Sequence, residues 1–169
     1  ARDRAEKLLG DLKGRQLTVT EVKESKSSVL SPGLYDLTEL QRDANKRFGY
    51  SAKETLNIMQ RLYENHKVLT YPRTDSRYIG KDVAETLKER LQACAVGPYR
   101  KVAGKLLLQP IRTDKRFVDD SKVSDHHAII PTEQFVQLDH MSSEERKIYD
   151  LVVRRFLAVL YPPCEYEQI

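Results

Sequence analysis

Residues 69–78 read LTYPRTDSRY, which places a tyrosine hydroxyl two positions before a guanidinium among hydroxyl and acidic side chains. Pro72 fixes its own φ at about −65° and favours an extended conformation at Tyr71. Because alternate residues of an extended segment point the same way, we expect Tyr71 and Arg73 to face one ligand together. A guanidinium binds phosphate as a planar fork and favours an ionised phenol. The pattern indicates a tyrosine that attacks phosphorus; without its context, it would be a turn with a surface tyrosine.

A second segment, residues 125–132 with the sequence DHHAIIPT, holds two adjacent histidines between an acidic residue and an apolar pair. Imidazole titrates near neutral pH, so the segment puts two such titrating groups at one place. Neighbouring residues point to different faces, and only one histidine is expected to reach a given site. The alternative is a loop with one exposed and one packed histidine. A metal site is not predicted here, because Cys, Asp and Glu are not clustered around the pair.

Composition bounds the class of protein. The chain has 169 residues, 40% hydrophobic and 32% charged, which suits one folded domain with pieces of a neighbour. Its net charge of +4 is compatible with a polyanionic partner without demonstrating one. The two cysteines have no metal-ligand spacing, and no apolar run approaches the roughly 20 residues of a membrane span. We expect a cytoplasmic protein, and both ends resemble cuts in a longer chain.

A compact central unit is expected to position the two segments. One helix begins at Asp36 or Thr38 and ends before Gly49, and a capping box at residues 51–54 opens a second helix. An extended stretch, residues 68–71, follows. This order is typical of a helix-turn-helix with a strand after it.

The remaining elements give a fold class that is mainly α with short β-strands (α+β). The strongest helix is expected between a capping box at Ser142 and a stop at Pro162. Other expected elements are a helix over 1–12, a strand over 17–22, a helix over 81–94, mostly loop with a short helix over 99–122, and the start of a strand over 165–169.

Together these features resemble the cleavage domain of type IA DNA topoisomerases. Residues 69–76 are similar to the family's active-site motif, and residues 125–132 are similar to its downstream histidine motif. Residues 35–41 and 48–52 resemble the start of that domain. The proline after the tyrosine and the doubled histidine are closer to the topoisomerase III branch than to bacterial topoisomerase I. The resemblance is best over residues 30–160.

The resemblance implies that Tyr71 attacks single-stranded DNA, forms a 5′-phosphotyrosyl link and permits strand passage and religation without ATP. It implies that Arg73 binds the non-bridging phosphate oxygens and that His126 hydrogen-bonds the phosphate or assists proton movement. A further set of residues near the motifs is expected to orient the loop or contact DNA: Lys67, Thr74, Asp75, Ser76, Arg77 and His127.

The resemblance also implies partners and a domain plan. Mg²⁺ is expected in the parent enzyme, in a metal-binding domain outside this chain, and no residue here is assigned to it. Residues 1–32 and 139–169 are expected to be partial segments of a gate-forming arch around a winged-helix-like cleavage domain, residues 33–138. Partners implied are single-stranded DNA, the remaining domains and a helicase, with RNA left open, in a bacterial, nucleoid-associated protein without a membrane.

Two other interpretations stay open from the sequence alone. The two helices around Gly49 and the excess of basic over acidic residues also suit a non-catalytic, winged-helix-like DNA-binding module. A protein-interaction domain whose tyrosines only pack is the third. The three interpretations differ in what they require of Tyr71, because only a cleavage domain needs its hydroxyl.

Overall fold

The computed structural model describes residues 2–16 and 18–169, and the chain divides into two compact units. The first comprises residues 1–28 together with 165–169, and the second comprises residues 29–164. The second unit holds the apolar core and both predicted motifs. The mainly helical α+β class predicted from the sequence is confirmed.

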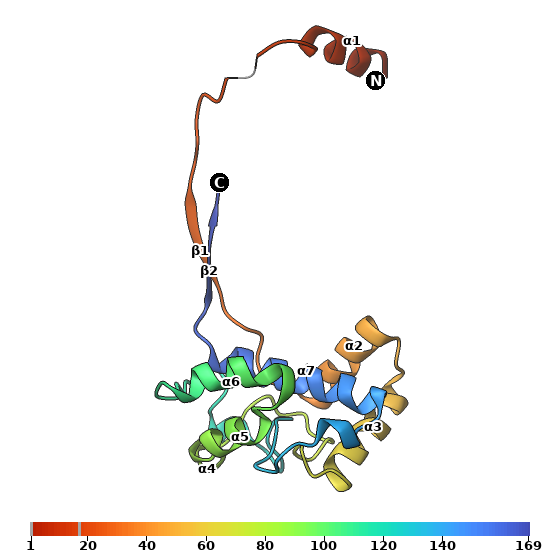
Figure 1. The fold of residues 1–169 in the computed structure, drawn as a ribbon, viewed down its shortest axis with the longest axis vertical. Coiled ribbons are helices and arrows are strands. Elements are labelled where there is room, and N and C mark those ends of the chain that lie inside the picture. The colour runs from red at the N-terminus through yellow and green to blue at the C-terminus, as the bar shows by residue number, and fades with distance from the viewer. Residues whose placement is uncertain (1, 17) are drawn as a thin grey trace. The chain divides into compact units, whose positions relative to one another are not determined.

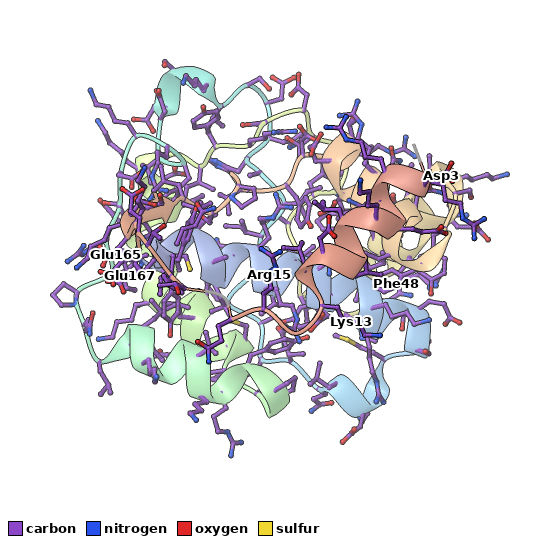
Figure 2. All side chains as sticks on the ribbon, turned by 90° about the horizontal axis from the view of Figure 1, so that it is seen from above. Asp3, Lys13, Arg15, Phe48, Glu165 and Glu167 are labelled. Carbon is purple, nitrogen blue, oxygen red and sulfur yellow. The ribbon has the colours of Figure 1, made fainter. Side chains whose placement is uncertain are left out.

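The first unit contains α1 (Arg2–Leu12) and most of a two-stranded antiparallel sheet of β1 (Ser25–Val29) and β2 (Cys164–Gln168) (Figure 1). Lys26 of β1 pairs with Glu167 of β2, with Nζ and Oε1 3.4 Å apart. Figure 2 labels Glu167 on this strand. The predicted helix over 1–12 and the predicted strand start at the C-terminal end are therefore confirmed.

The predicted strand over 17–22 is wrong for the residues that the structure describes; Leu17 lies outside them. Residues 18–22 have no strand, and their apolar side chains Val19 and Val22 are 77% and 62% exposed. Alternation of apolar and polar residues makes a strand only where one face packs and a neighbour supplies hydrogen bonds. The strand lies instead at β1, where β2 supplies that neighbour.

The helix-turn-helix of the second unit forms as predicted. The Asp36 side chain accepts from the Glu39 N–H at the start of α2 (Leu37–Phe48), and Gly49 ends the helix with φ +74°. A reciprocal capping box at Ser51 then opens α3 (Ala52–Glu64). Figure 2 labels Phe48, the last residue of α2. Local cap chemistry alone sets these boundaries.

The helix predicted over 81–94 is interrupted, which corrects that prediction. The structure has α4 (Lys81–Glu85) and α5 (Leu87–Cys94), with Thr86 at φ −94° and ψ 5° between them. The Thr86 hydroxyl donates to the Val83 carbonyl 2.9 Å away, so the side chain competes with the backbone ladder. Four short elements follow: η1 (Gly97–Tyr99), α6 (Arg100–Leu107), η2 (Asp120–Lys122) and η3 (Leu138–His140).

The central helix of the second unit is α7 (Ser143–Leu160), which contacts α2, α3 and α6 (Figure 1). Residues at helical spacing form its inward face: Ile148, Leu151, Val152 and Val159 are buried, and Arg155 is half-buried. The assignment of this helix to a flanking arch concerns the longer protein and stays a prediction, as do the other expected domain boundaries. No helix among the described residues is long and apolar enough to cross a membrane.

Candidate active site

Residues 71–77 form an extended segment outside any helix or strand, and their burial alternates. Pro72, Thr74 and Ser76 are buried. Between them, Arg73, Asp75 and Arg77 are exposed, and Tyr71 is half-buried. The period of two places the tyrosine and the guanidinium on the outward side of one segment, as the sequence predicts.

The tyrosine segment lies beside the histidine segment because the two form a short antiparallel ladder. Leu69 bridges Pro131, and the Thr70 N–H donates to the Ile130 carbonyl at 3.0 Å. Leu69 and Pro131 are buried, so apolar packing holds the backbones together where they pair. The residue after this short ladder is Tyr71.

The ladder brings the rings of Tyr71 and His126 into contact. Their centroids lie 4.3 Å apart with the planes tilted by 41°. A third ring, that of Tyr63 near the end of α3, meets Tyr71 edge-on with centroids 5.5 Å apart. His126 is exposed, so its imidazole faces solvent beside the Tyr71 side chain. A phenol in contact with an imidazole, with the exposed Arg73 guanidinium two positions along the chain, suits attack on a phosphate.

Thr74 and Ser76 tie the backbones together from the buried side. The Thr74 hydroxyl donates to the His126 carbonyl at 3.3 Å and accepts from the Ser76 N–H at 3.1 Å. The Ser76 hydroxyl lies 3.0 Å from the Lys122 carbonyl. Both residues are under 7% exposed, so they hold the backbone of the loop from its buried side, and their expected contact with DNA stays a prediction.

The outward charged residues differ in what they contact. Arg73 is exposed, and in the described part of the chain its guanidinium makes no ion pair with a carboxylate. Arg77 instead contacts Asp36 at 2.8 Å and Glu39 at 3.0 Å, and the hydrogen bond that it donates to Asp36 raises the pKa of Arg77. Asp75 accepts from a serine hydroxyl at 3.3 Å. Arg77 thus anchors the segment to the start of α2, and the expected phosphate contact of Arg73 stays a prediction.

His127 lies in a different environment from His126. Its Nδ1 accepts from the Gly80 N–H at 3.1 Å, and its Nε2 lies 3.8 Å from an Asp82 carboxylate oxygen. Gly80 is crowded, because an added Cβ would meet Asp82, Asp120 and the His127 ring, and each of these side chains would have to shift. The two neighbouring histidines thus face different surroundings, His126 beside Tyr71 and His127 beside Gly80. The expected role of His126 and the expected DNA contact of His127 stay predictions.

Lys67 sits where the chain reverses between α3 and the ladder. Its φ of +57° is left-handed, which is unusual for a residue with a side chain. The Thr132 hydroxyl donates to the Lys67 carbonyl at 2.6 Å and holds this reversal. An open groove next to the tyrosine is lined by Tyr63, Glu64, Lys67, Leu69 and Thr132.

The residues around Tyr71 do not fit a metal ion. Among residues 2–16 and 18–169, no three His, Cys, Asp or Glu side chains gather closely enough to hold one. Asp75 and Asp36 near the segment already accept hydrogen bonds from protein donors. No catalytic step is therefore derived through a metal on this chain.

Tyr63 lies beside the candidate site although its helix pattern alone gives it only an apolar place on α3. Its ring contacts that of Tyr71, and the residue is 36% exposed. Its sequence position is consistent with this contact. Tyr63 lies near the end of α3, and the chain reverses direction at Lys67, four residues later, before it reaches Tyr71.

Comparison with known proteins identifies similar sequences over the same span. Residues 1–169 match the family described as DNA topoisomerase. The chain is 66% identical over 167 residues to DNA topoisomerase 3 of Bacillus anthracis, which covers 97% of this chain and 23% of that protein. It is 53% identical over 166 residues to DNA topoisomerase 3 of Bacillus subtilis (strain 168), covering 98% and 23%. The chain thus spans about a quarter of the length of the curated relatives it matches.

One solved structure has a similar fold. Full-length topoisomerase I from Thermotoga maritima superposes with a TM-score of 0.66 at 27% identity. The match covers 96% of this chain and 26% of that one.

Proposed function

Because the chain belongs to the DNA topoisomerase family, of type IA, we propose that it carries the strand-cleaving tyrosine of such an enzyme. The observation that carries this proposal is the contact between the rings of Tyr71 and His126, whose centroids lie 4.3 Å apart. The exposed Arg73 follows Tyr71 by two positions on the outward side of the same extended segment, so side chains suited to phosphoryl transfer come from two segments far apart in the sequence.

The proposed reaction is a reversible exchange of phosphate esters. The Tyr71 oxygen attacks a phosphodiester of single-stranded DNA, and a bond from tyrosine oxygen to phosphorus forms. The bond from phosphorus to the 3′ oxygen breaks, and that oxygen leaves as a 3′-hydroxyl with the proton that the tyrosine lost. The 5′ end stays linked to Tyr71, so the ester energy is kept and religation needs no ATP.

The neighbouring side chains have distinct proposed roles. Arg73 stabilises negative charge on the non-bridging oxygens as it grows in the transition state. His126 donates a hydrogen bond to the scissile phosphate or carries the proton between the tyrosine and the leaving oxygen. Lys67, exposed beside the groove, adds attraction for the flanking phosphate.

Other partners belong to the whole enzyme. We place the Mg²⁺ requirement in the remaining part of the protein, which would supply charge neutralisation at the phosphate. Single-stranded DNA is the proposed substrate, with RNA as a second substrate to be tested and a helicase as a proposed partner. A nucleoid-associated, cytoplasmic location follows from that substrate. Alone, residues 1–169 are expected to turn over poorly.

The test is covalent capture in the full-length enzyme that contains this chain. The wild-type protein should form a denaturant-stable adduct with end-labelled single-stranded DNA, and Tyr71→Phe should form none. Tyr50→Phe is the matched control, because Tyr50 is a half-buried tyrosine at the α2–α3 turn, packed against Phe48. An adduct that persists in Tyr71→Phe would overturn the assignment.

A second candidate, a non-catalytic DNA-binding module, is favoured by the α2–α3 helix-turn-helix alone. It predicts that Tyr71→Phe leaves every DNA-dependent property unchanged. Binding of single-stranded DNA that weakens with rising salt would suit both candidates. Only adduct formation separates them.

A further inference from the structure

Arg90 is a charged residue that the proposed chemistry does not use, although it is only 8% exposed. It projects from α5, and its guanidinium makes three contacts. Nε donates to the Thr86 hydroxyl at 2.8 Å, Nη1 donates to the Pro131 carbonyl at 2.9 Å, and Nη2 lies 2.6 Å from a Glu133 carboxylate oxygen. Burial lowers the pKa of Arg90, and the Glu133 charge opposes that shift. Burying a cation costs desolvation energy, which is offset only where the charge is paired and its donors are hydrogen-bonded.

The carbonyl that Arg90 binds has no partner within the ladder. The Thr70 N–H donates to the Ile130 carbonyl and the Thr132 N–H donates to the Val68 carbonyl, which makes Leu69 and Pro131 a non-hydrogen-bonded pair. The Pro131 carbonyl therefore faces away from the tyrosine segment. Proline has no N–H, so the carbonyl is the one backbone group with which Pro131 itself can bond on that edge.

Arg90 consequently binds the ladder at the outward carbonyl of Pro131. The paired stretch is short, with backbone hydrogen bonds from Thr70 and Thr132 and side-chain bonds from threonines beside them, so the contact of Arg90 adds to a limited set. The pinned residue, Pro131, pairs with Leu69, two positions before Tyr71. Five positions before Pro131 the same segment carries His126, whose ring touches Tyr71. A slip of Pro131 would move His126 relative to the tyrosine.

We propose that Arg90 is a positioning residue for strand cleavage: its contacts with the Pro131 carbonyl and Glu133 hold the histidine segment in register, so that His126 meets Tyr71. The inference rests on the proposed function of Tyr71. It assigns Arg90 no contact with DNA, because the guanidinium is buried behind the ladder.

The test is single-turnover cleavage in the full-length enzyme at saturating single-stranded DNA. The amplitude reports the fraction of folded, active enzyme, and the rate constant reports the chemistry. Arg90→Gln should lower the rate constant at least about tenfold, with DNA affinity within about twofold of wild type. Arg90→Lys, which keeps the charge but loses the planar fork, should fall between. Val152→Ala, which removes buried volume from α7, should lower the melting temperature without changing the rate constant.

A double-mutant cycle with His126→Ala tests the route of the effect. Arg90→Gln should change the rate constant little in the His126→Ala background, because the group that it positions is gone. Additive effects, or a wild-type rate constant in Arg90→Gln with only a lower amplitude, would overturn the proposal. If Arg90→Gln does not fold, Glu133→Gln decides by the same criteria, since Glu133 is 43% exposed at its side chain. Absence of any adduct in the wild type would instead refute the proposed function of Tyr71.

Discussion

The ring of Tyr63 meets the ring of Tyr71 edge-on, with the centroids 5.5 Å apart and the planes at 79°. Tyr71 therefore contacts one ring from α3 and another, that of His126, from the histidine segment. Two ring contacts limit the orientations of the Tyr71 side chain. For the proposed attack on a phosphodiester, a Tyr71 side chain already limited in this way loses less entropy on reaching the reactive geometry.

Replacing Tyr63 tests this packing. Tyr63→Ala should lower the cleavage rate constant about three- to tenfold, because an edge-to-face aromatic pair contributes roughly 0.5–1.5 kcal/mol. Tyr63→Phe keeps the ring and should retain nearly the full rate. Single-turnover cleavage of end-labelled DNA by the full-length enzyme measures both. Equal losses in the two variants would assign the effect to the Tyr63 hydroxyl and refute the ring contact as its source.

Arg73 and Arg77 should respond in opposite ways to substitution. Arg73 is exposed beside the nucleophile, so Arg73→Ala should reduce cleavage by about 10²-fold while the protein stays folded. Arg77 is paired with Asp36 and Glu39, so Arg77→Ala should mainly loosen the segment and lower the melting temperature. Cleavage rates and thermal unfolding of both variants check the contrast. Unchanged cleavage in Arg73→Ala would remove its role as the phosphate ligand.

A side chain at Gly80 is predicted to be costly, because Asp120 and His127 accept backbone hydrogen bonds there and would have to shift. An added Cβ would lie 3.1 Å from an Asp120 oxygen, 3.2 Å from the His127 ring and closer still to Asp82. Gly80→Ala should therefore destabilise the compact unit by about 1–3 kcal/mol in urea denaturation. Gly104→Ala is the control, because Gly104 lies in α6 with nothing within 4 Å of its Cβ position. That substitution should stabilise by up to about 1 kcal/mol, and equal effects at both sites would contradict the crowding argument.

Local chemistry explains why much of the fold could be predicted from the sequence. The caps at Asp36, Ser51 and Ser142 each need only residues within one helical turn, and all three form as expected. The extended, alternating tyrosine segment is equally local, since Pro72 and its neighbours determine it. The family's motifs added the pairing of the tyrosine with a histidine segment 55 residues later.

What the sequence could not supply depends on distant neighbours. The helix predicted over 81–94 has a regular apolar pattern, but it is interrupted where the Thr86 hydroxyl bonds the Val83 carbonyl. The strand at β1 exists because β2, more than 130 residues later, pairs with it. The contact of Arg90 with the Pro131 carbonyl likewise has no local sequence signal. The roles of Tyr71, Arg73 and His126 in catalysis stay predictions until measured.

Glu145 links the start of α7 to the end of α3. Its N–H donates to the Ser142 hydroxyl, and its carboxylate accepts from the Ser142 N–H at 2.8 Å. The same carboxylate accepts from Arg61 Nε at 2.8 Å and lies 3.3 Å from His66 Nε2. Burial alone raises the pKa of Glu145, but the bonds from Ser142 and Arg61 and the charge of His66 outweigh it. The net result is a pKa below the ordinary value of 4.5.

A lowered pKa in the folded state makes the contribution of Glu145 to stability depend on pH in a defined direction. The unfolded chain binds this proton more readily than the folded chain, so the stabilisation is fully present above the unfolded pKa and is lost as pH falls through the folded pKa. Glu145→Gln should therefore cost about 1–2 kcal/mol near pH 7, through the weakened cap and ion pair. The difference from wild type should shrink progressively below about pH 4.5. Urea denaturation of the 169-residue chain at pH 7 and pH 3 measures it, with the exposed Glu64→Gln as the control. A difference of equal size at both pH values would mean that side-chain packing, and not the carboxylate charge, joins α7 to α3.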